Sequence, residues 1–181
     1  MAWTAANAAR FGGDASRLSL MGSSAGGNLA INAAYLANAG RLESSCGGTV
    51  PRVAAVIALY PPVDLAAAGE SREPGMSDAA RAFNANYLGG NAEQYPDRYR
   101  FVASATHINA AAPPTLLIFG ENDHLVPPSA TDRFAEQAQR SGIKVQAIRF
   151  PYGDHAFNLN QYGIGNQFYL AMAQQFLEAH E

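Results

Sequence analysis

Continuous apolar runs of strand length predict a sheet that is covered on both faces. Residues 53–60 read Val-Ala-Ala-Val-Ile-Ala-Leu-Tyr, and residues 115–120 read Thr-Leu-Leu-Ile-Phe-Gly. Runs without alternation are typical of strands buried on both sides, as in parallel sheets. Residues 17–22 predict a further strand, whereas residues 144–150 alternate and predict a less buried strand near a sheet edge.

Helical patterns lie before, between and after these strands. The last one places Phe168, Met172 and Phe176 at i, i+4 and i+8, on one face of a helix. Strands that alternate with helices indicate a mostly parallel sheet with helices on both faces, so we predict a three-layer α/β sandwich with about four strands. The predicted helices span residues 2–11, 24–39, 128–141 and 165–179.

Residues 64–112 interrupt this alternation. They contain Gly, Pro, Asn and many charged residues, and they predict two short helices over 77–88 and 92–103. We interpret the segment as a cap-like excursion outside the sheet. A chain of 181 residues is long enough for one domain with a sizeable core, so we expect residues 1–181 to form a single domain.

Composition and charge indicate which kinds of binding partner and cellular location to expect. Apolar residues make up 48% of the chain and charged residues 15%, which suits a compact globular protein. The formal net charge of −3 comes without a basic stripe, so we do not expect nucleic acid as a partner. No run of apolar residues is long enough to span a membrane and the first residues do not resemble a signal peptide, which favours the cytoplasm.

Cofactor, metal and thiol chemistry are not indicated. The sequence has neither a P-loop nor a G-x-G-x-x-G stretch, and its His and acidic residues lack metal-ligand spacing, so we expect no cofactor and no metal. Cys46 is the single cysteine, which excludes an intramolecular disulfide. It lies in a Ser/Gly loop without a basic neighbour to activate it, and we predict no task for it.

One short stretch indicates nucleophilic chemistry. Gly22-Ser23-Ser24-Ala25-Gly26 matches G-x-S-x-G, and it lies between a predicted strand and a predicted helix, which is the context of a nucleophile elbow. We expect Gly22 and Gly26 to keep Cβ atoms out of the tight turn. Ser24 would then expose its Oγ at a helix start, where free amides favour developing negative charge.

Two other loops follow predicted strands and bring the remaining groups for this chemistry. In parallel sheets the loops after the strands share one rim, and there the chain holds Ser24, Asp123 and His155, in that order. Serine needs a base to take its proton as it attacks, histidine titrates near neutrality, and a carboxylate fixes the histidine tautomer. The order Ser, Asp, His is that of α/β-hydrolases.

Each role has alternatives in the sequence. Glu121 and Asp154 are other acids, although Asp154 adjoins His155 and neighbouring side chains usually point apart. His124 is another base, but it adjoins the acid on the same loop, and we interpret it as a loop histidine. His107 and His180 have no motif around them.

Together these stretches resemble the C-terminal part of an α/β-hydrolase, and more narrowly the hormone-sensitive-lipase-like esterases. In that family an Asp often precedes the nucleophile, where this chain has Ser23, and a Gly often follows the catalytic histidine, where it has Ala156. Neither change removes a catalytic group. The resembling stretches are residues 7–14, 22–30, 60–65, 113–123 and 155–157.

The resemblance departs at the front of the chain. Family members have several strands before the elbow and an early His-Gly-Gly-Gly loop that supplies oxyanion-hole amides, and residues 1–23 match neither. The resemblance therefore implies an α/β-hydrolase truncated at its N-terminus, with the Ala25 amide as the remaining donor. Strand 17–22 would have one open edge, so we expect either a homodimer through this edge or a fragment of a longer protein.

The resemblance and the motifs lead to one principal prediction of function. We expect a serine carboxylesterase that cleaves small acyl esters through an acyl-enzyme intermediate, weakened by the missing oxyanion loop. A prolyl-oligopeptidase-type peptidase or amide hydrolase would use the same three groups. An inactive fragment or interaction module remains as the alternative from another class.

Overall fold

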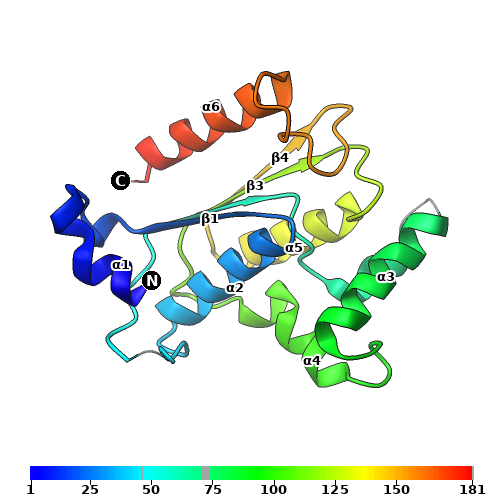
Figure 1. The fold of residues 1–181 in the computed structure, drawn as a ribbon, viewed down its shortest axis with the longest axis horizontal. Coiled ribbons are helices and arrows are strands. Elements are labelled where there is room, and N and C mark those ends of the chain that lie inside the picture. The colour runs from blue at the N-terminus through cyan, green and yellow to red at the C-terminus, as the bar shows by residue number, and fades with distance from the viewer. Residues whose placement is uncertain (46, 71–73, 181) are drawn as a thin grey trace.

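Four parallel strands form the centre of the molecule (Figure 1). The computed structural model describes residues 1–45, 47–70 and 74–180, so Cys46 lies outside the described residues. The sheet order is β1-β2-β3-β4, and each strand is parallel to its neighbour. The predicted α/β class is confirmed. The strands are β1 (Ser19–Ser23), β2 (Ala55–Leu59), β3 (Thr115–Gly120) and β4 (Val145–Phe150).

Helices cover both faces of this sheet. Figure 1 shows α2 and α5 on one face and α6 on the other, which gives three layers. The predicted helix over 2–11 is an α-helix followed by a 3-10 turn, Ala8–Phe11. None of the helices among the described residues is long and apolar enough to cross a membrane. The α-helices are α1 (Ala2–Asn7), α2 (Ala25–Asn38), α3 (Pro74–Leu88), α4 (Pro96–Val102), α5 (Pro128–Arg140) and α6 (Ile164–Glu178).

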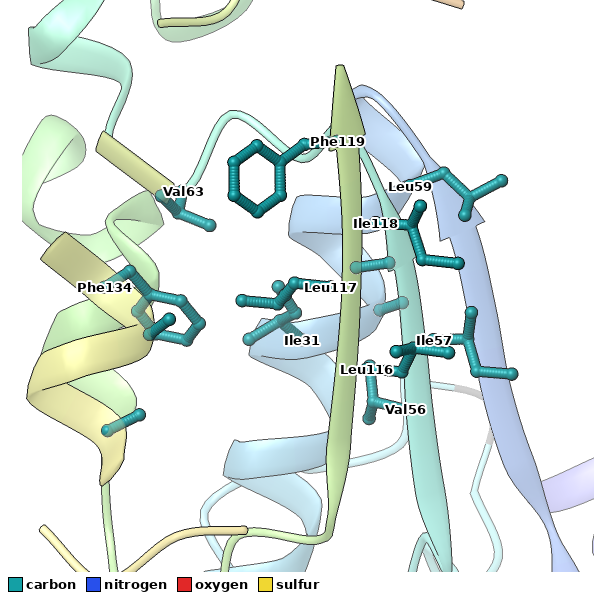
Figure 2. Packing of buried hydrophobic residues seen from close by; sticks show 14 of the residues in the cluster. Ile31, Val56, Ile57, Leu59, Val63, Leu116, Leu117, Ile118, Phe119 and Phe134 are labelled. Atoms are coloured by element: carbon teal, nitrogen blue, oxygen red, sulfur yellow. The ribbon is translucent and has the colours of Figure 1, made fainter. Parts of the chain in front are cut away.

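The core explains why the two central strands lack alternation. In Figure 2, Leu117 and Phe119 of β3 point toward Ile31 of α2 and Phe134 of α5, whereas Ile118 points to the opposite face. Every residue of β2 and β3 is buried, because helices cover both faces. Strand β4 is an edge strand with partly exposed residues, as its alternating sequence predicts.

The excursion between β2 and β3 has a small cluster of its own, made by Leu65, Leu88 and Tyr99. Both predicted helices form, but the second one begins at Pro96 rather than at residue 92. Proline is well suited to a first helical turn, because N–H groups there have no acceptor within the helix and proline has no N–H to leave unpaired. Before it, the Asn91 and Gln94 side chains bond each other's backbone amides at 2.9 and 3.1 Å, which makes a turn of the residues between them.

Buried amides join α2 to the end of the excursion. The Asn28 side-chain nitrogen lies 2.9 Å from the Val102 carbonyl oxygen, 3.1 Å from that of Pro62 and 3.2 Å from the Ser104 hydroxyl. Asn32 donates to the same Val102 oxygen at 2.9 Å. These contacts fix the helix that follows the predicted nucleophile against the excursion.

Replacing Asn28 with alanine should lower the free energy of unfolding by about 2–4 kcal/mol. The Pro62 carbonyl and the buried Ser104 hydroxyl lose this donor, and the Asn32 side chain loses the Asn28 oxygen as an acceptor. Urea denaturation followed by circular dichroism measures the change. The matched control is Asn86→Ala on the exposed face of α3, for which we expect a change within about 0.5 kcal/mol. Equal losses for the two variants would contradict the role assigned to Asn28.

Candidate active site

Ser24 lies in a strained turn between β1, which ends at Ser23, and α2, which begins at Ala25. Its φ and ψ are 51° and −126°, a region that residues other than glycine rarely adopt. Gly22 makes the turn possible, because a Cβ atom there would overlap the carbonyl group of Gly26. The backbone of β1 and the first turn of α2 therefore approach each other closely only because residue 22 has no side chain.

The second glycine of the pattern has a different environment from the one predicted. A Cβ atom at Gly26 would meet no described heavy atom within 4 Å, so the expectation that Gly26 keeps the turn clear is wrong. Gly27 has that role instead, since a Cβ there would lie 3.1 Å from Cβ of Pro61 and 3.2 Å from the Gly22 oxygen. The close contact arises from how α2 packs against the end of β2, which the local pattern does not contain.

The structure brings Ser24, Asp123 and His155 together at the carboxyl ends of the strands. Nε2 of His155 lies 3.0 Å from Oγ of Ser24, and its Nδ1 lies 2.9 Å from Oδ2 of Asp123. The three residues come from the loops after β1, β3 and β4, whose strands are parallel. The imidazole therefore connects a hydroxyl to a carboxylate.

Asp123 is held on its other side by its own loop. Its Oδ1 accepts backbone hydrogen bonds from Leu125 at 3.0 Å and Val126 at 2.7 Å. Only 1% of its side chain is exposed, whereas 16% of the His155 side chain is. The carboxylate therefore has a fixed orientation, with Oδ2 directed at the imidazole.

Tyr60 is a contact of the imidazole that sequence reasoning missed. Its ring meets the His155 ring edge-on at a centroid distance of 4.6 Å, and its hydroxyl donates to Oδ1 of Asn158 at 2.6 Å. Burial raises the pKa of Tyr60. The Tyr60 backbone is strained, with a φ of 38°. In the sequence, the feature that could have pointed to Tyr60 is the Tyr-Pro-Pro stretch at the end of a buried strand.

The alternative acids and bases have other surroundings. Oδ2 of Asp154 lies 3.0 Å from Nδ1 of His124, so each of these residues pairs with the other. Glu121 is exposed. His107 is buried, with Nε2 2.6 Å from the Phe101 carbonyl oxygen, and Nδ1 of His180 lies 2.8 Å from the carbonyl oxygen of Phe176.

An apolar pocket of about 370 Å³ opens beside Ser24 and Ala25. Its walls come from the loop after β2, from α3 and from the loop that carries Asp123. The excursion therefore forms one side of the space next to the serine hydroxyl. The apolar wall residues include Val63, Leu65, Ala80, Phe83, Leu125 and Ala130.

Comparison with known proteins gives the family. The BD-FAE family model matches residues 1–138. Probable carboxylic ester hydrolase LipM of Mycobacterium tuberculosis is 31% identical over 161 residues, which cover 88% of this chain and 36% of LipM. Esterase LipC of the same organism is 28% identical and is covered over 39% of its length. The chain thus spans well under half the length of these relatives.

Solved structures agree with the sequence relatives. Esterase LipW of Mycobacterium marinum has a TM-score of 0.74 at 29% identity, over 97% of this chain and 54% of LipW. Esterase Est2 of Thermogutta terrifontis with butyrate bound has a TM-score of 0.74 at 25% identity, over 98% of this chain and 61% of Est2. The predicted resemblance to α/β-hydrolase esterases is therefore confirmed, and the chain belongs to the BD-FAE family.

Proposed function

We propose that the chain is a serine hydrolase that cleaves small carboxylic acid esters through an acyl-enzyme intermediate. The observation that carries the proposal is the position of the His155 imidazole, 3.0 Å from Oγ of Ser24 and 2.9 Å from Oδ2 of Asp123. Both distances are within the reach that general-base catalysis requires. The names of the relatives, which are esterases, support the same chemistry.

In this proposal each of the three groups has a role in the reaction. As Oγ of Ser24 bonds to the ester carbonyl carbon, Nε2 of His155 takes the hydroxyl proton, and Asp123 stabilises the imidazolium. The imidazolium then protonates the leaving alcohol as the ester C–O bond breaks, which leaves an acyl group on Ser24. Water attacks the acyl carbon as Nε2 of His155 takes one of its protons. The imidazolium then returns this proton to Oγ of Ser24 as the bond between Oγ and the acyl carbon breaks, and the carboxylic acid leaves.

We assign the Ala25 amide as a donor to the oxyanion of the tetrahedral intermediate. Ala25 is the first residue of α2, where amides have no intrahelical acceptor and the helix dipole favours negative charge. The 181 residues contain no His-Gly-Gly-Gly stretch to supply further donors. Each missing donor costs about 10²–10³ in kcat, so we expect slow turnover by this chain alone.

The pocket beside Ser24 suits an apolar part of the ester. Filling it with Ala80→Phe on α3 should raise KM for p-nitrophenyl butyrate about tenfold, because apolar contacts of the substrate are lost. KM for ethyl acetate, which needs little of the pocket, should change less than about twofold. Spectrophotometry and pH-stat titration measure the two substrates. Equal changes in KM would show that the pocket does not hold the ester.

Labelling with a fluorophosphonate probe and hydrolysis of p-nitrophenyl acetate test the proposal. We expect a covalent adduct on the peptide that contains Ser24, located by mass spectrometry, and none on the Ser24→Ala variant. A folded wild-type chain that neither labels nor hydrolyses the ester would favour an inactive module. An aminoacyl-nitroanilide cleaved faster than the ester would favour a peptidase.

We also propose that two copies associate through β1. The strand pairs only with β2 among the described strands, and Met21 on it is 51% exposed. Unpaired edges recruit other strands, and charged residues there oppose pairing. Sedimentation at high protein concentration should show a dimer that Met21→Lys dissociates. A wild-type monomer under those conditions would overturn this part.

A further inference from the structure

Two Asp-His dipeptides face each other across the loops after β3 and β4. Asp123-His124 follows β3, and Asp154-His155 follows β4. Each carboxylate contacts the imidazole of the other dipeptide, with Oδ2–Nδ1 distances of 2.9 Å for Asp123 and His155 and 3.0 Å for Asp154 and His124. The proposed reaction uses the first pair, and the second pair has no assigned task.

The Asp154 carboxylate also binds the backbone of both loops. Its Oδ1 accepts from the His124 amide at 3.0 Å and from the His155 amide at 2.6 Å. The Asp154 side chain thus joins His124, which follows the proposed acid, to His155, which is the proposed base. A second link joins the same two loops one residue before each dipeptide: the backbone N–H of Asn122 donates to the Gly153 carbonyl oxygen at 2.9 Å.

The pair of Asp154 and His124 is expected to contribute little to folding stability. The Asp154 side chain is 58% exposed and that of His124 is 42% exposed, and pairs in such positions contribute little to folding. Burial would raise the pKa of Asp154, but the hydrogen bonds from His124 and His155 outweigh it and hold that pKa below its usual value. The carboxylate is therefore ionised at neutral pH, and each of its oxygens has a hydrogen-bond partner.

We infer that Asp154, with His124, positions the base of the reaction. By fixing the backbone of His155 against the loop of Asp123, the pair keeps the imidazole within hydrogen-bond distance of both Asp123 and Ser24. An error of about 1 Å in such a position can cost about 100-fold in rate. The inference rests on the proposed function, and it makes Asp154 a positioning residue that does not touch the substrate.

Kinetics of Asp154 variants test the inference. Asp154→Ala should lower kcat for p-nitrophenyl acetate about tenfold to a hundredfold with KM changed less than about twofold, because the pocket is untouched. Asp154→Asn keeps an oxygen for the two backbone amides and should recover most of the rate. The matched control is Asp132→Ala, which removes a different carboxylate, one that joins α5 to Arg149 of β4.

A proton NMR signal gives a readout that does not depend on turnover. The Nδ1 proton of His155, shared with Asp123, should give a downfield signal in the wild type that disappears in His155→Asn. We expect Asp154→Ala to shift or broaden it and Asp132→Ala to leave it unchanged. If wild-type chain is inert toward ester and probe, the proposed function fails while this signal still tests the positioning.

The outcomes separate a positioning role from a structural one. A kcat within twofold of wild type for Asp154→Ala, or an unchanged His155 signal, would overturn the inference. So would a loss of thermal stability that accounts for the lower activity and is not relieved by Asp154→Asn. If Asp154→Ala does not fold, His124→Ala is tested in its place, because it leaves both backbone hydrogen bonds to Asp154 intact. This variant should lower kcat about twofold to fivefold and should also shift or broaden the His155 signal.

Discussion

Replacing Asp123 with asparagine is expected to lower kcat for p-nitrophenyl butyrate by about 10³–10⁴-fold, with KM nearly unchanged. The reason lies in the tautomer of His155. If the asparagine oxygen takes the place of Oδ1, it still accepts from the amides of Leu125 and Val126. The asparagine NH₂ then faces Nδ1 and donates to it, which places the imidazole proton on Nε2, and that nitrogen cannot accept the proton of Ser24.

The same reasoning predicts that the variant folds normally. The side chains have equal size and both backbone hydrogen bonds persist, so we expect the thermal midpoint to change by no more than a few degrees. Steady-state kinetics beside thermal denaturation separate the two effects. Glu121→Gln is the matched control, because it neutralises an exposed acid two residues away. A rate lost in Glu121→Gln and kept in Asp123→Asn would transfer the role of the acid to Glu121.

The sheet could be predicted because its strands are buried in a way that the sequence records. The all-apolar runs of β2 and β3 follow from helices on both faces, and the alternation in β4 follows from its place at the edge. Once parallel strands are inferred, the loops that carry Ser24, Asp123 and His155 must share a rim. The rule for strand ends therefore placed three residues together that are far apart in the chain.

The parts that could not be predicted depend on contacts between distant segments. The Tyr60 ring contacts the His155 ring because the loops after β2 and β4 meet. The sequence of either loop alone does not indicate that these two rings lie together. From the sequence, Asp154 is an alternative acid for the adjacent His155, whereas in the structure its carboxylate pairs with the imidazole of His124 across the two loops. Adjacent side chains diverge, and residues on facing loops converge.

The glycines of the elbow lead to the second large effect. Gly22→Ala should lower the free energy of unfolding by about 3 kcal/mol or more, because its Cβ would overlap backbone atoms of Gly26 and Gly27 that belong to a helix and cannot move as a flexible side chain can. Separating β1 from α2 would also turn Ser24 away from His155, so labelling by a fluorophosphonate should fall with stability. Urea denaturation and labelling rates on the soluble variant measure both.

Gly26→Ala is the control that isolates this cause. The added Cβ meets no described atom within 4 Å, and the position lies inside α2, where alanine is favoured over glycine by up to about 1 kcal/mol. We therefore expect unchanged or increased stability, with labelling of Ser24 retained. The two substitutions are chemically identical and four residues apart in one motif, and helix propensity accounts for at most about 1 kcal/mol of the difference. A larger difference therefore comes from what each Cβ meets. Similar losses at both positions would mean that the strand-to-helix approach does not hold Ser24 in place.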